Sequence, residues 1–225
     1  MLSSLPWTGD IVGVFSSGTV DMLAAFLTND WLSDNHIHWI LENYSRDIAD
    51  THPRSLIHLD TSLLTLIEVY GGGMSSESTE GHWLKRFNTR FTTGDIDRFG
   101  FMINVNGNHW VACVLDFRTH EILYGDSFHK PIRQAHLDVL RSWADDLLPK
   151  PGGHFNLKSL PITSQSDGFS CGILATNALA SYCSDGVIPL ISETSELVTT
   201  RLKTFLEIAN RHNELVGTCI RICRL

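Results

Sequence analysis

The spacing of apolar residues along the chain predicts where helices give way to strands. Before residue 93, apolar residues recur every three or four positions, as on one face of a helix. Three helices are expected there: one capped by Asp34 with Ile37, Ile40, Leu41 and Tyr44 on one face, one capped by Asp60 with Leu63, Leu64 and Ile67, and a short one around Trp83, Leu84 and Phe87. Glycines 71–73 end the second helix, and residues 74–80, which lack an apolar face, predict a loop.

From Arg98 onward the pattern becomes alternating or continuously apolar, which is typical of strands. Strands are predicted over residues 99–105, 109–115 and 121–124, the last two joined as a hairpin by a turn at 116–119, and another over 154–160. Between them, residues 131–148 have helical spacing, with Leu137, Leu140, Trp143 and Leu147 on one face.

Two further helices are predicted towards the C-terminus. Residues 171–182 are mainly small or apolar, as expected for a helix buried in a core. The last helix carries Val198, Leu202, Phe205 and Ala209 at steps of four, three and four, which predicts an apolar stripe. Helices and strands together predict the α+β class, and 225 residues, 43% of them hydrophobic, are enough for one domain over residues 1–225.

Charge and cysteine content narrow the classes of partner. Seventeen basic and 25 acidic residues give a formal charge of -8, with no cluster of Lys and Arg to neutralise nucleic acid or an anionic membrane. The N-terminus lacks the features of a signal peptide, and no apolar run is long enough to span a bilayer. Five cysteines without C-x-x-C spacing indicate free thiols. We therefore expect an intracellular protein, nuclear or cytoplasmic, without nucleic acid or membrane partners.

Cys171 is the candidate nucleophile. It follows Ser170, which stands where an N-cap is expected, and the turn Asp167-Gly168, so its thiol should lie in the first turn of the buried helix. The positive end of a helix dipole, together with a histidine imidazolium, stabilises a thiolate.

A thiolate nucleophile needs a base that returns a proton to the leaving group, and histidine titrates in the right range. His109 stands out among 11 histidines because it follows a turn and begins a strand. Asp126 ends the next strand, where it can orient the ring, and the Gln165 amide with the Cys171 backbone N–H can form an oxyanion hole.

Three other patterns receive simpler interpretations. The remaining thiols are expected to be small core residues: Cys113, Cys183, Cys219 and Cys223. His36 and His38 point to different faces of a helix, so we expect solvated side chains and no metal site. Residues 168–172 fit G-x-S-x-G with Ser170 as nucleophile, but only His212 follows and no buried strand precedes, so the thiol hypothesis is favoured.

At these residues the sequence resembles the Ulp1-type ubiquitin-like-protein proteases, the family of SUMO-specific proteases. The shared motifs occur in the family's order: Trp31-Leu32-Ser33-Asp34, His109-Trp110, Asp126-Ser127, and Gln165 with five residues before Cys171-Gly172. The chain departs from the family where Gly125 replaces a larger residue, where Ser170 replaces the Asp before the Cys, and in its middle segment.

The resemblance implies a papain-like cysteine protease fold, with a central mixed sheet flanked by helices and the nucleophile at the N-terminus of a buried helix. It implies Cys171, His109, Asp126 and Gln165 as catalytic residues and no cofactor. Trp31 and Trp110 would wall a narrow passage for a Gly-Gly tail, since glycine has no Cβ to clash.

The expected function is a cysteine-type peptidase or isopeptidase that cleaves after the C-terminal Gly-Gly of a ubiquitin-like modifier, for deconjugation or precursor maturation. A SUMO-like protein is the leading candidate for this modifier. The expected partners are that modifier and its conjugates, and the chain is expected to be a monomer. Two alternatives stay open: a non-catalytic module that binds a ubiquitin-like protein, and the same chemistry on ubiquitin, another modifier or an acetyl donor.

Overall fold

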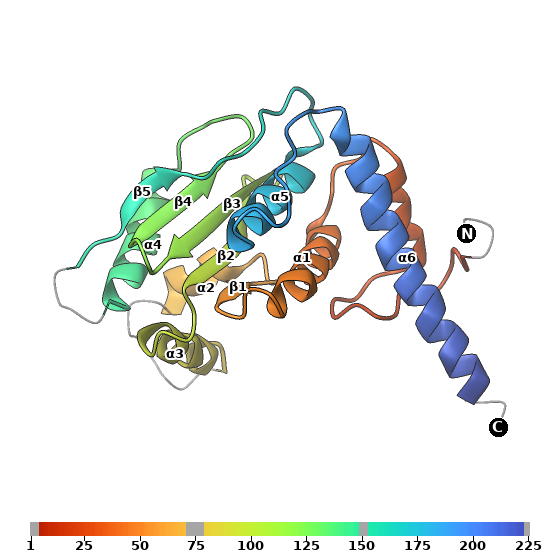
Figure 1. The fold of residues 1–225 in the computed structure, drawn as a ribbon, viewed down its shortest axis with the longest axis horizontal. Helices are drawn as coiled ribbons and strands as arrows, with labels where there is room; N and C mark the ends of the chain where they lie inside the picture. Colours follow the sequence, from red (N-terminus) through yellow and green to blue (C-terminus); the bar gives the residue numbers. More distant parts are fainter. Residues whose placement is uncertain (1–4, 71–78, 149–152, 223–225) are drawn as a thin grey trace.

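A five-stranded mixed sheet forms the centre of the computed structural model, which describes residues 5–70, 79–148 and 153–222, without the side chains of 79–83, 85–86 and 217–222. The strands lie side by side in sequence order: β1 (Ser55–Ile57), β2 (Arg98–Val105), β3 (His109–Asp116), β4 (Glu121–Gly125) and β5 (Asn156–Ser159). The three central strands pair antiparallel, whereas β1 and β5 run parallel to their neighbours (Figure 1). The predicted α+β class with a mixed sheet is confirmed.

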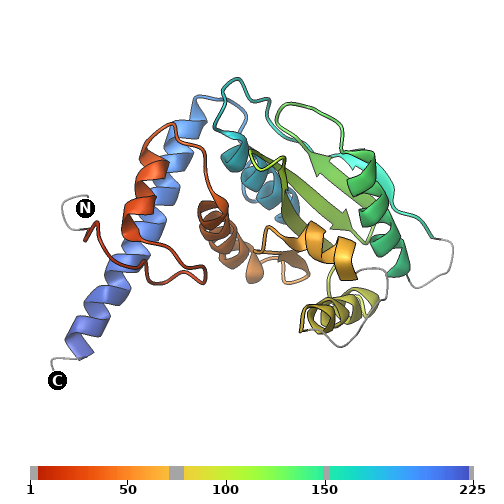
Figure 2. The same ribbon diagram turned by 180° about the vertical axis from the view of Figure 1, so that it is seen from behind.

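Helices cover both faces of this sheet. The described helices are η2, a 3-10 helix (Val20–Leu27), α1 (Asp34–Ala49), α2 (Leu63–Tyr70), α3 (Thr79–Thr92), α4 (Gln134–Asp146), α5 (Cys171–Cys183) and α6 (Glu196–Ile222). Of these, η2 and α6 pack against each other beside the sheet (Figure 1). Helices α5 and α1 lie on the face seen in Figure 1, and α2, α3 and α4 lie on the face seen in Figure 2. Among the described residues, no helix is both long and apolar enough to cross a membrane.

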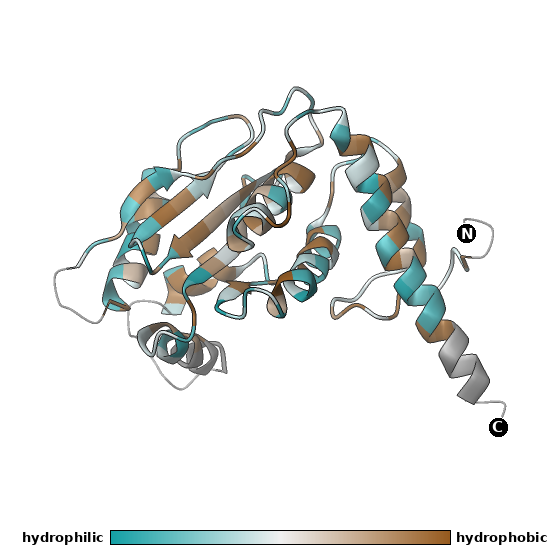
Figure 3. Ribbon diagram, viewed as in Figure 1, coloured by the Kyte–Doolittle hydropathy of each residue, from teal (hydrophilic) through white to brown (hydrophobic). Residues whose placement is uncertain are grey.

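The position of β3 at the centre of the sheet explains why its sequence is continuously apolar. Successive side chains point to opposite faces of a strand, and both faces of this sheet are covered. Trp110, Ala112 and Val114 join the core under α1 and α5, whereas the alternate residues Val111, Cys113 and Leu115 join the core under α2 and α4. Apolar colour accordingly runs along the central strands and α5 (Figure 3).

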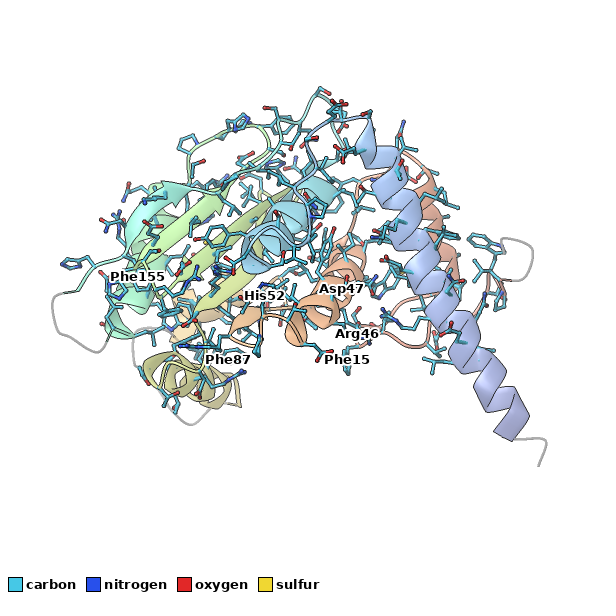
Figure 4. All side chains as sticks on the ribbon, viewed as in Figure 1. Phe15, Arg46, Asp47, His52, Phe87 and Phe155 are labelled. Atoms are coloured by element: carbon cyan, nitrogen blue, oxygen red, sulfur yellow. The ribbon has the colours of Figure 1, made fainter. Side chains whose placement is uncertain are left out.

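The second of these cores is rich in aromatic rings. Phe99 lies with its ring centroid 5.0 Å from Phe91 and 6.2 Å from Trp143. Phe155 lies at the β5 edge of the sheet and Phe87 on α3 (Figure 4). The cluster joins α3, α4 and the sheet, so it holds these helices against the face of the sheet seen in Figure 2.

The turn between β2 and β3 depends on residues that tolerate the left-handed region. Asn106 has φ of 59° and Gly107 has φ of 76°, values that asparagine and glycine adopt at least cost. The turn therefore reverses the chain tightly, and His109 becomes the first residue of β3, as predicted.

Most predicted elements are present, with differences at their ends. The inward face of α1 is confirmed, but Ser33 stands at its N-cap and Asp34 lies in the first turn. Asp60 accepts from the Ser62 N–H at 2.8 Å, just before α2 begins. The glycine stop and most of the loop at 74–80 lie outside the described residues. Strand β1 and η2 were not predicted.

The expectation that His36 is solvated is wrong. Its side chain is buried, and its two ring nitrogens bond to local partners. The Ser33 backbone N–H donates to Nδ1 at 3.1 Å, and Nε2 lies 2.8 Å from the Met22 carbonyl oxygen. Burial lowers the pKa of His36, so the ring is neutral and joins α1 to η2.

The apolar stripe predicted for α6 is only half correct. Phe205 and Ala209 are buried, but Val198 is 73% exposed and Leu202 is 46% exposed. The buried face instead includes Arg201, which is 4% exposed and donates to the carbonyl oxygens of Ala25 and Asp30. Both bonds come from Nη2 and reach carbonyl groups that are distant in sequence, so a charged residue occupies a position that the apolar pattern excludes.

Replacing Phe99 with Ala is expected to lower the free energy of unfolding by about 3–5 kcal/mol, because it removes a buried ring that packs against several others and leaves a cavity. Chemical denaturation measures this loss. Phe15→Ala is the matched control, since Phe15 is 85% exposed and its loss should cost less than about 0.5 kcal/mol. Equal effects of the two substitutions would contradict the assignment of Phe99 to the core.

Candidate active site

The start of β3, the end of β4 and the start of α5 meet at one edge of the molecule. Antiparallel pairing places the beginning of β3 beside the end of β4. The loop after β4 and the loop before α5, green and teal in Figure 1, arch over the same upper edge. His109, Asp126 and Cys171 stand at these three chain positions.

The His109 ring is held from two sides. Its Nε2 lies 2.9 Å from Asp126 Oδ1, and the Asp126 carboxylate also accepts from the Phe128 backbone N–H at 2.7 Å. The Phe128 ring stacks on the imidazole with centroids 5.0 Å apart and planes 25° apart. With Nε2 used by Asp126, Nδ1 is the ring nitrogen left for a partner on the other side.

That partner is Cys171, the first residue of α5, whose side chain is buried. A side-chain hydrogen bond with Cys171 raises the pKa of His109; burial opposes this, and the hydrogen bond and charge of Asp126 raise it further. The net effect is upward, so the imidazolium form of His109 is stabilised relative to that of a free histidine. Three residues predicted from separate segments are therefore brought together in the order that a thiolate nucleophile requires.

Gln165 connects the loop before α5 to the end of β4. Its Oε1 accepts from Ser127 Oγ at 2.8 Å, and its backbone N–H donates to the Ser127 carbonyl oxygen at 2.8 Å. Its Nε2 donates to the Asp167 carbonyl oxygen at 2.8 Å and to Asp167 Oδ1 at 3.1 Å. The amide donors thus face Asp167 in this structure, within the loop that leads to the thiol.

Asp167 organises the backbone that leads into the nucleophile, a role that the sequence analysis missed. Its Oδ1 accepts from the backbone N–H groups of Phe169 at 2.9 Å and Ser170 at 2.8 Å, and its Oδ2 accepts from Ser170 Oγ at 2.7 Å. Burial would raise the pKa of Asp167, but these hydrogen bonds outweigh it and lower the pKa. An Asp-Gly turn before a helix start was the available signal.

The serine-nucleophile arrangement is not formed. Ser170 is fully buried, and its hydroxyl donates a hydrogen bond to Asp167 Oδ2 instead of to a histidine. His212 lies on α6, where its Nδ1 accepts from the Val12 backbone N–H at 3.1 Å. The base that the G-x-S-x-G pattern requires therefore serves to join α6 to the N-terminal segment.

The other described thiols are buried core residues, as predicted. Cys113 and Cys183 are fully buried, and burial raises the pKa of Cys113 and raises that of Cys183 to about 12. Both thiols are free. The Cys219 and Cys223 side chains lie outside the described residues. Within the described ranges, no group of three or more His, Cys, Asp or Glu residues is arranged to hold a metal ion.

The two tryptophans predicted to wall the substrate passage are in contact. Trp31 and Trp110 stack with centroids 5.7 Å apart and planes 12° apart. Trp110 is fully buried and donates from Nε1 to the Leu32 carbonyl oxygen at 2.7 Å, whereas Trp31 is half-buried. A peptide backbone between two rings needs a separation of about 7 Å, twice a van der Waals contact distance. The rings are closer than that here.

Two glycines allow close packing beside the site. A Cβ at Gly172 would lie 2.9 Å from Ile37 Cδ1 and 3.4 Å from Trp110 Cδ1, so a small residue lets α5 approach α1. A Cβ at Gly125 would lie 3.1 Å from Leu160 Cδ2. The departure from the family at Gly125 thus has a local reason, because Leu160 fills the space of a side chain.

A family model, the Ulp1 protease family C-terminal catalytic domain, matches residues 30–193 of the sequence. The chain belongs to the Ulp1 protease family. It is therefore a cysteine protease, and the predicted papain-like fold is confirmed. No curated protein matches the chain at the level of sequence.

Solved structures share the fold of this Ulp1-family chain. The SUMO protease Ulp1 with its catalytic cysteine oxidised to a sulfonic acid is 21% identical, with a TM-score of 0.67, over 86% of this chain and 84% of that one. The Ulp1 protease domain in complex with Smt3, the yeast ortholog of SUMO, is 20% identical, with a TM-score of 0.66, over 92% and 90%. The Xanthomonas campestris effector XopD bound to ubiquitin is 20% identical, with a TM-score of 0.50, over 78% and 92%.

In this Ulp1-family protease, Asp126→Asn is expected to lower the pKa of His109, because the carboxylate favours the imidazolium through its hydrogen bond and its charge. NMR titration of the ring protons measures the shift, and His36, which bonds to Ser33 and Met22 instead, is the internal control. An unchanged His109 midpoint would contradict the prediction.

The same substitution should change stability with a defined sign. The pKa of His109 is raised above 6.5 in the folded state, so its contribution is complete below pH 6.5 and is lost as pH rises through the folded pKa. The difference in unfolding free energy between wild type and Asp126→Asn should therefore shrink over that range.

Asp167→Ala is expected to speed hydrogen exchange at the Phe169 and Ser170 amides about tenfold to a hundredfold, because each loses a half-buried carboxylate acceptor worth about 1–3 kcal/mol. Hydrogen exchange followed by mass spectrometry measures the change. Asp146→Ala, at an exposed position in α4, should leave these amides as they are. Retained protection in Asp167→Ala would show that other contacts hold the loop.

Proposed function

We propose that the protein is a thiol isopeptidase or endopeptidase that cleaves after the C-terminal Gly-Gly of a ubiquitin-like modifier, with a SUMO-like protein as its first substrate. One observation carries the proposal: His109 bonds Asp126 at 2.9 Å, and its pKa is raised first by the thiol of Cys171, which begins the buried helix of a Ulp1-family domain. Free thiols at Cys113, Cys171 and Cys183 support an intracellular site of action.

The reaction follows from the order of these groups. The Cys171 thiolate attacks the carbonyl carbon of the terminal glycine, and the tetrahedral adduct collapses to a thioester as the C–N bond breaks. His109 donates its proton to the leaving amine, either a lysine side chain or the first residue of an extension. His109 then takes a proton from water, which hydrolyses the thioester and releases the modifier as a carboxylate. Asp126 keeps the ring oriented throughout.

The start of α5 supplies stabilisation for the oxyanion. Backbone N–H groups in the first turn of a helix have no partner within the helix, so the Cys171 N–H is a preorganised donor. Gln165 is the proposed second donor. Because its Nε2 bonds to Asp167 here, it would release one of these bonds when the oxyanion forms.

The choice of substrate rests on the aromatic pair and on relatives. Trp31 is half-buried and stacks on Trp110, and the proposal requires it to move away from Trp110 to admit a chain without side chains. The complex of Ulp1 with Smt3 favours a SUMO-like modifier. The complex of XopD with ubiquitin makes ubiquitin the second candidate.

The test uses a panel of modifiers that carry a C-terminal electrophile, with adducts detected by intact mass. The wild type should form a covalent adduct with the SUMO probe, Cys171→Ala should form none, and Cys113→Ala, which removes a buried thiol outside the site, should retain it. An undiminished adduct in Cys171→Ala, or none with any probe, would refute the proposal. Binding without an adduct would favour the non-catalytic module, and an adduct with ubiquitin alone would favour the second candidate.

A further inference from the structure

A cavity of about 420 Å³ opens beside the His109 ring. It is lined by the turn before β3, the end of β4 with the loop that follows, and Gly168 of the loop before α5. His109 and Asp126 are among its lining residues, whereas Cys171, Trp31 and Trp110 are not. The cavity therefore begins at the histidine and does not include the thiol or the aromatic pair.

The position of the cavity beside His109 indicates which part of a substrate would enter it. His109 must touch the leaving nitrogen to protonate it, so the chain that carries this nitrogen continues past the ring. The modifier tail is proposed to arrive along Trp31 and Trp110, on the thiol side. The cavity is thus on the path of the leaving group, and Gly168 borders it without adding a side chain.

The charge of the cavity is positive, in contrast to the protein's formal charge of -8. Its cations are Lys130 and Arg133, both exposed, and its one carboxylate, Asp126, is bonded to His109. Arg133 donates to the Asn106 amide oxygen, and the Lys130 ammonium lies 5.5 Å from the Phe128 ring centroid. In the part of the chain that the structure describes, neither cation forms a salt bridge.

Neutral donors complete the lining. Asn108 contributes an amide, and Tyr124 contributes a phenol whose pKa is raised, first by burial and then by Asp126, so it stays protonated. A second cavity of about 290 Å³ shares Tyr124, Asp126, Lys130 and Pro131 with the first. Lys130 therefore lines both cavities.

We propose that this cavity binds a carboxylate side chain of the conjugated protein, close in sequence to the lysine from which the modifier is removed. The inference rests on the proposed function and adds a preference on the leaving-group side. Two cations without acidic partners, together with neutral donors, suit an anion that arrives with the substrate. A basic residue at the same place would meet repulsion.

The test compares isopeptide substrates in which one modifier is joined to the lysine of short labelled peptides that differ only in flanking residues: Glu, Gln or Lys. The wild type should cleave the Glu peptide with kcat/KM about threefold to tenfold above the Gln peptide, as expected for two exposed charge pairs. The Lys peptide should be slower than the Gln peptide. The preference should weaken at about 0.5 M salt, where such pairs are screened.

The double variant Lys130→Gln/Arg133→Gln should bring the Glu-to-Gln ratio close to one. Lys203→Gln is the matched control, since Lys203 is 75% exposed on α6 and pairs with Glu207, so it should keep the wild-type ratio. Equal rates for all three peptides, or a preference that survives the double variant, would overturn the inference. If the enzyme cleaves none of the peptides and also fails to release a small neutral leaving group from the same modifier, the proposed function is overturned instead.

Discussion

Antiparallel pairing of β3 with β4, in a sheet buried on both faces, is the interaction on which the site depends. The pairing brings His109 at the start of one strand beside Asp126 at the end of the next. Burial of β3 under α5 brings the start of that helix to the same edge, with Cys171 as its first residue. Because three backbone segments fix three side chains, the geometry does not rely on flexible loops alone.

The site was predictable where its signals are local. The turn at 106–108, the apolar strand after it and the small-residue helix beginning at Cys171 each carry their own pattern, so the positions of His109 and Cys171 follow from short stretches of sequence. Strand β1 has only three residues and forms by pairing with β2, about forty positions away. Nothing in so short a segment distinguishes a strand from a loop, since its partner is remote.

Other features depended on contacts that no pattern records. Arg201 is buried, and the carbonyl oxygens of Ala25 and Asp30 accept its hydrogen bonds. The buried face of α6 therefore includes Arg201, whereas Val198 and Leu202 of the predicted stripe are exposed. Asp167 was visible as a turn residue, but its role appears only when four polar groups converge on it. Ser170, a departure from the family, uses its hydroxyl in the same network.

The bonds of Arg201 also concern how much of the chain the site needs. The family match covers residues 30–193, yet the Asp30 carbonyl that precedes Trp31 is held by an arginine on α6, beyond that region. The same helix packs along η2, and Trp7 stacks on Phe205 with centroids 6.4 Å apart. The segment before Trp31, the tryptophan proposed at the substrate entrance, is thus held by α6. Helix α6 is in turn held by its contacts with η2 and Trp7. A fragment trimmed to residues 30–193 would keep the reactive groups but lose the helix that holds the segment before Trp31.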